Sequence, residues 1–68
     1  MTKFISDKVM DALRNERKGI IFYKSLAENV RNIKYKKLFL KIANDEKRHK
    51  ELLEKAYIHF RDIDSMRM

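Results

Sequence analysis

Two carboxylates and one imidazole interrupt otherwise apolar patterns in this sequence. Glu16 lies in a series of apolar residues that recur at alternating steps of four and three, and Glu46 and His49 lie in a second such series. Burial of an unpaired carboxylate costs several kcal/mol, so these groups must be exposed, paired or bound to metal. Residues three apart are neighbours on a helix, and a carboxylate with an imidazole suits iron, manganese or zinc. The pattern therefore predicts a metal site made by Glu16, Glu46 and His49.

The two apolar series predict the helices that position these ligands, because such spacing marks one face of a helix. We expect one domain over 1–68, with a helix over about 6–30, a turn near 31–33, a second helix over about 33–61 and a frayed tail over 62–68. The first series consists of Val9, Leu13, Ile20, Tyr23, Ala27 and Val30, and the second of Phe39, Ile42, Leu53, Ala56 and Phe60.

Short polar residues mark the expected helix ends. Ser6, followed by Asp7, is the expected N-cap of the first helix, and Asn32 is the expected centre of the turn. A short turn makes the two helices antiparallel neighbours, with opposed residue numbers that add up to about 63. Glu16 then faces position 47, between Glu46 and His49, so all three ligands are expected at one level of the hairpin.

Composition limits how such a chain can be stable. It has 68 residues, one glycine, no proline and no cysteine, which excludes disulfides, zinc–thiolate sites, iron–sulfur clusters and cysteine nucleophiles. A chain this short has a small core and commonly needs a metal or a partner chain. Both helices also carry more apolar surface than one partner helix can cover. The predicted fold is all-α: an antiparallel two-helix hairpin that dimerises into a four-helix bundle, giving the metal site four carboxylates and two imidazoles.

The charge and hydropathy of the sequence predict where the protein is located and which partners it has. No apolar run is long enough for a membrane span or a signal peptide, so we expect a cytoplasmic protein without a membrane partner. The net charge of +7 is spread among acidic residues, as on a solvated helix face, and we expect no nucleic-acid partner. The alternative is a metal-free hairpin that binds nucleic acid, with Tyr35 to stack on a base and a set of cations formed by Lys34, Lys36, Lys37, Lys41, Lys47, Arg48 and Lys50.

Two local patterns resemble those of a known family. They resemble the two helices of the rubrerythrin-type branch of the ferritin-like superfamily, over roughly residues 9–57, and the single-hairpin layout is similar to that of encapsulated ferritins, which dimerise to complete a di-iron site. The first pattern comprises Ala12, Leu13, Glu16, Gly19, Phe22 and Tyr23, and the second comprises Ala43, Glu46, His49, Leu52 and Leu53.

The resemblance implies a role for each ligand. Glu16 would be a terminal iron ligand, Glu46 the bridging carboxylate and His49 the nitrogen ligand, while Tyr23 would lie near the site or pack beside it. Gly19 stands where the family usually has alanine.

The resemblance also implies an activity and its partners. We expect a ferroxidase-type di-iron enzyme that oxidises Fe(II) with O2 or peroxide at the interface of a homodimer or higher even-numbered oligomer. Each dimer would hold two iron ions, with manganese or zinc as other metals, and a protein shell or an electron donor as a further partner. The alternative is a non-catalytic module that binds or stores iron with the same ligands.

Overall fold

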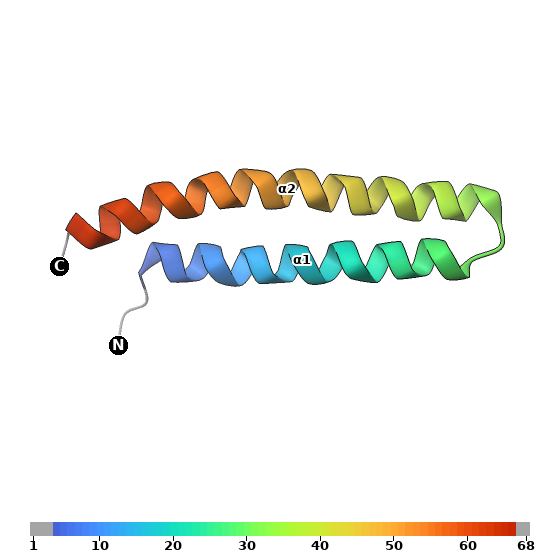
Figure 1. Ribbon diagram of the computed structural model, residues 1–68, viewed down its shortest axis with the longest axis horizontal. Coiled ribbons are helices and arrows are strands. Elements are labelled where there is room, and N and C mark those ends of the chain that lie inside the picture. Colours follow the sequence, from blue (N-terminus) through green and yellow to red (C-terminus); the bar gives the residue numbers. More distant parts are fainter. Residues whose placement is uncertain (1–3, 67–68) are drawn as a thin grey trace.

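Two antiparallel helices joined by a short turn form the computed structural model, which describes residues 4–66 (Figure 1). Helix α1 spans Ile5–Asn29, with 25 residues, and helix α2 spans Ile33–Met66, with 34 residues. At about 1.5 Å per residue α2 is about 51 Å long, which accounts for the longest dimension of the hairpin, 53 Å. The expected all-α hairpin is confirmed.

Asn32 begins the second helix. Its Oδ1 accepts hydrogen bonds from the backbone N–H groups of Lys34, at 2.9 Å, and Tyr35, at 3.3 Å. These are two of the N–H groups that have no partner within the helix, so the asparagine side chain acts as an N-cap. On the other side of the turn, the N–H of Val30 donates to the carbonyl of Leu26 at 3.0 Å, which closes the last turn of α1.

The start of α1 differs from the expectation that Ser6 is its N-cap. The N-cap is Phe4, whose side chain cannot cap the helix, and Ser6 lies inside the first turn. The backbone N–H and the Oγ of Ser6 both donate to Oδ2 of Asp64, at 3.0 and 2.6 Å. A carboxylate at a helix N-terminus satisfies unpaired N–H groups and interacts favourably with the helix dipole. The cap of α1 therefore comes from α2.

The end of α2 also differs from expectation. The helix runs to Met66 instead of ending near 61, and Asp64 is only 5% exposed. The contact between Asp64 and Ser6 gives these last turns a partner, which a frayed tail would lack. Residues 67 and 68 of the expected tail lie outside the described residues.

We expect Asp64→Ala to lower the free energy of unfolding by about 1–3 kcal/mol, because it leaves the buried Ser6 donors without their acceptor. The matched control is Asp62→Ala, two residues away, since Asp62 is 62% exposed and pairs with Arg61 at 3.7 Å on the surface. That change should stay within about 0.5 kcal/mol. Urea denaturation at one fixed protein concentration measures both. Equal losses in the two variants would show that the Asp64 cap contributes nothing specific.

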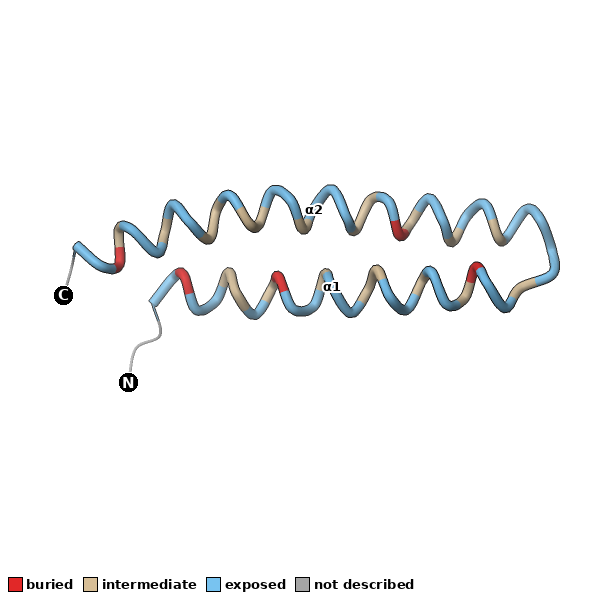
Figure 2. Tube along the Cα trace, in the orientation of Figure 1, coloured by how far each residue is buried: buried red, intermediate tan, exposed pale blue. Residues whose placement is uncertain are grey.

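The hairpin is one helix thick. Its shortest dimension is 11 Å, about the diameter of a single helix. Among residues 4–66, the buried apolar side chains are those of Leu13, Ala27 and Ala43, all on the seam between the helices (Figure 2). Several larger apolar side chains are exposed instead, including Leu38 and Leu52. The folded chain therefore leaves much of its apolar surface uncovered.

Neither helix of the hairpin is apolar enough over a sufficient length to cross a membrane, as judged over residues 4–66.

Candidate metal centre

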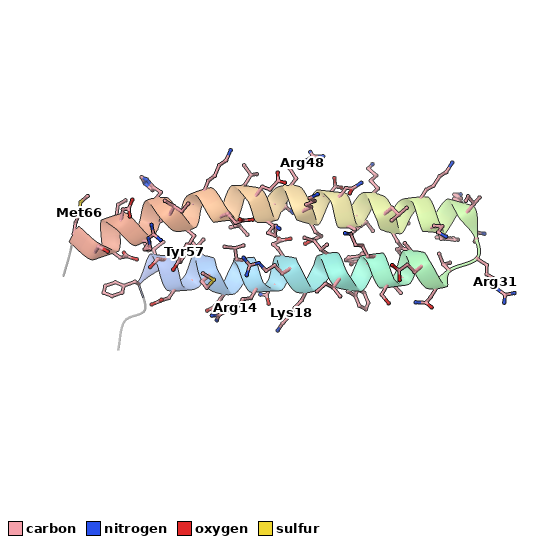
Figure 3. All side chains as sticks on the ribbon, in the orientation of Figure 1. Arg14, Lys18, Arg31, Arg48, Tyr57 and Met66 are labelled. Carbon is pink, nitrogen blue, oxygen red and sulfur yellow. The ribbon has the colours of Figure 1, made fainter. Side chains whose placement is uncertain are left out.

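The three expected ligands come from the middle of both helices. Glu16 lies halfway along α1, and Glu46 and His49 lie halfway along α2. In Figure 3 side chains from both helices fill the space between the ribbons at this level, whereas Lys18 and Arg48 point away from the opposite helix. Mid-helix positions are the most firmly held part of a hairpin, because both ends of each helix lie several turns away.

Apart from His49, the expected apolar series of α2 is half-buried, and residues outside that series join it on the seam. Ala43 is buried and Lys50 and Tyr57 are half-buried, so these residues lie along the seam. His49, expected within the stripe that faces α1, has a side chain that is 55% exposed. Its imidazole therefore lies at the edge of the seam, open to one broad face of the hairpin.

The side chains nevertheless converge. Glu16, Glu46 and His49 each offer one ligand atom, and these atoms all lie within 4.8 Å of one another. Nδ1 of His49 is 3.8 Å from Oε1 of Glu16, across the two helices. The expectation that the three residues share one level of the hairpin thus agrees with the structure, and no other such group of three occurs within residues 4–66.

Glu16 has an unsatisfied carboxylate. Its Oε2 is buried and no hydrogen-bond donor reaches it. The pKa of Glu16 is raised above the usual glutamate value, first by a hydrogen bond shared with Glu46, then by burial and by the charge of Glu46, while the charge of His49 lowers it. Two ionised carboxylates cannot bond to each other, because neither has a proton to donate. A proton or a metal cation between Glu16 and Glu46 removes this conflict.

The ligand set fits one divalent transition-metal ion. Two ligands on opposite sides of an ion, each about 2.0–2.2 Å away, are at most about 4.4 Å apart. Atoms within 4.8 Å of one another need only small side-chain rotations to close on such an ion. Two carboxylates and one imidazole suit iron, manganese or zinc. Three ligands would leave the coordination of such an ion incomplete.

Gly19 lies directly against Glu46. A Cβ placed on Gly19 would be 3.1 Å from Oε2 of Glu46 and 3.5 Å from its Cδ. Gly19 follows Glu16 by one helical turn, so the Glu46 side chain lies along the stretch of α1 that carries the first ligand. Gly19 is noticeable in the sequence as the one glycine of the chain, but its contact with Glu46 could not be predicted from the sequence.

Tyr23 lies apart from the three ligands. It follows Glu16 by seven residues, which is about 10 Å along the helix. The centroid of its ring lies 5.3 Å from that of Phe22 and 6.4 Å from that of Phe39. These contacts suit a packing role, and a role for Tyr23 beside a metal ion stays a prediction.

A surface depression elsewhere shares no residue with this centre. It runs along α2 alone and is lined by Glu51, Glu54, Lys55 and Ile58. Because one helix forms the whole lining, the depression has no opposing wall to hold a ligand. The convergent side chains, and not this hollow, are therefore the candidate site.

Comparison with known proteins gives one match. A family model described as Rubrerythrin matches residues 7–66, which is most of the chain and includes all three ligand positions. No curated protein and no solved structure is significantly similar to the chain.

Proposed function

The chain belongs to the rubrerythrin family, and on that premise we propose that it is a di-iron carboxylate protein that oxidises Fe(II) with O2 or peroxide. The convergence of Glu16, Glu46 and His49 from two helices carries this proposal. Glu16 also has a buried oxygen without a donor, which a cation would satisfy. Bound Fe(II) would supply the electrons: two Fe(II) would reduce O2 with two protons to H2O2, or H2O2 with two protons to two waters, and leave two Fe(III).

We further propose that two chains form the working unit. One hairpin offers three ligands, and a second copy related by a two-fold axis doubles them to four carboxylates and two imidazoles. Four ionised carboxylates balance the charge of two divalent ions, which favours two ions in one shared site. The hairpin alone cannot close the site, because it is one helix thick.

The exposed imidazole supports a proposal for the face on which the second copy docks. Leu38 precedes His49 by eleven residues, about three full turns of α2, so both lie on the same face. Leu38 and Leu52 are both exposed, and Leu52 follows His49 by about one helical turn, so this face carries uncovered apolar surface on either side of the imidazole. Covering this face would remove apolar surface from water and exclude water from the ligands in the same step.

The protein side chains have defined tasks in this scheme. Glu16 and Glu46 would hold the cation between their carboxylates, and its charge would offset the repulsion from Glu46 that helps to raise the pKa of Glu16. His49 contributes a neutral nitrogen, which limits the negative charge brought together at the centre. The surrounding apolar residues exclude water once the second copy is in place.

The test is to measure metal content and particle mass together. We expect anaerobic titration with Fe(II) to end at two ions on a particle of two chains, each of 8.3 kDa. Addition of O2 or peroxide should then oxidise both ions. Repeated turnover without iron accumulating on the protein would favour catalysis over storage. Iron bound to a particle of one chain, or no binding at all, would refute the proposal.

A further inference from the structure

Gly19 lies directly against a candidate ligand without being one itself. The three atoms closest to the place of its missing Cβ all belong to Glu46, at 3.1, 3.5 and 3.7 Å. The φ angle of Gly19 is not positive, so the backbone there does not require glycine. What the site gains from glycine is therefore space, and Glu46 occupies that space.

Helix α1 alone would favour a different residue at this position. Glycine inside a helix is less favourable than alanine, because it loses more conformational freedom on folding. Alanine would also leave the backbone undisturbed, since its φ and ψ are those of an ordinary helix. The local physics of α1 thus favours alanine, and the contact with Glu46 disfavours it.

We infer that Gly19 is a positioning residue that sets where the Glu46 carboxylate lies relative to Glu16 and His49. This inference rests on the proposed metal-binding function. A Cβ at 3.1 Å is closer than ordinary contact, and the atom that must move is the end of a flexible side chain. The carboxylate moves, while the helices stay in place. Because Glu46 lies within 4.8 Å of both other ligands, its displacement changes the geometry of the whole set.

The test separates metal binding from folding by using Co(II), whose visible absorption reports its ligands. Gly19→Ala should leave the metal-free protein at least as stable as wild type, since alanine favours the helix. Its Co(II) affinity should fall severalfold, because the Glu46 carboxylate must give way by a few tenths of an ångström to the new Cβ. The Co(II) absorption bands should also shift. The matched control is Ser25→Ala, an exposed change in the same helix, which should alter neither the affinity nor the spectrum.

A second comparison shows whether the effect runs through Glu46. In a Glu46→Ala background, adding Gly19→Ala should change the residual Co(II) affinity less than twofold, because the displaced group is gone. Three results would overturn the inference: a less stable metal-free Gly19→Ala protein, an unchanged Co(II) affinity and spectrum, or an equal effect in both backgrounds. Failure of the proposed function is distinct, since wild type itself would then bind no Co(II).

Discussion

His49→Ala should abolish iron oxidation and weaken Fe(II) binding by about 100-fold or more, because even groups that merely orient ligands contribute 10–100-fold. The only nitrogen ligand of the proposed site disappears, and two-fold symmetry removes it twice from each dimer. The fold should survive, since the His49 side chain is 55% exposed and its contact with Glu16 is 3.8 Å long. Anaerobic Fe(II) titration and oxidation rates measure the loss, and circular dichroism checks the helices.

The chain provides its own control for this change. His59, the other histidine, is exposed on α2, and its ring contacts Phe60 at 5.1 Å. His59→Ala removes the same side chain from the same helix, outside the group of three ligands. It should bind and oxidise iron like wild type. Wild-type rates from His49→Ala, or from Glu46→Ala, would disprove the ligand assignment.

Leu38→Glu should separate the dimer and remove the metal site with all three ligands still in place. Leu38 lies on the same face of α2 as His49, where the second copy is proposed to dock. A buried unpaired carboxylate costs several kcal/mol, and each 1.4 kcal/mol is a factor of ten in affinity. The dissociation constant of the dimer should therefore rise by about 100-fold or more. Analytical ultracentrifugation measures it, and Fe(II) titration of the same samples follows the site.

Leu40→Glu is the matched control. Leu40 is 43% exposed and Leu38 is 45% exposed, so the two changes introduce the same charge at equally open positions. Two residues along a helix turn a side chain to the opposite side, so Leu40 points away from the face that carries His49. The Leu40 variant should dimerise and bind iron normally. Loss of the dimer in both variants would place the interface elsewhere or show a general effect of charge.

The centre of the hairpin could be predicted from the sequence because few variables determine it. Glu16, Glu46 and His49 are the polar interruptions of two apolar series, and an asparagine near the midpoint indicates the turn. The position of the turn then determines that these three residues lie at the same level of the antiparallel hairpin. The exposure of His49 could not be predicted, because helix periodicity does not fix which edge of a stripe faces the partner helix. The His49 side chain is 55% exposed, whereas Ala43 is buried.

The open end of the hairpin was harder to predict. The expectation that opposed residue numbers have a constant sum holds only for straight antiparallel helices. Paired residue numbers add up to 62 for Glu16 and Glu46, but to 70 for Ser6 and Asp64. Helix α2 continues past the start of α1 and bends towards it in Figure 1, and Asp64 near its end accepts a hydrogen bond from Ser6. No local signal in the sequence links a capping carboxylate to a helix 58 residues away.

In the proposed dimer, the single-layer thickness of the hairpin, 11 Å, would tie its chemistry to protein abundance. A site that needs two copies obeys mass action, so dilution below the dissociation constant empties it of metal and also weakens the fold. Iron has the converse effect, since a ligand that binds only the assembled form pulls chains into it. The amount of protein made and the amount of iron present would then act together as one switch on the activity.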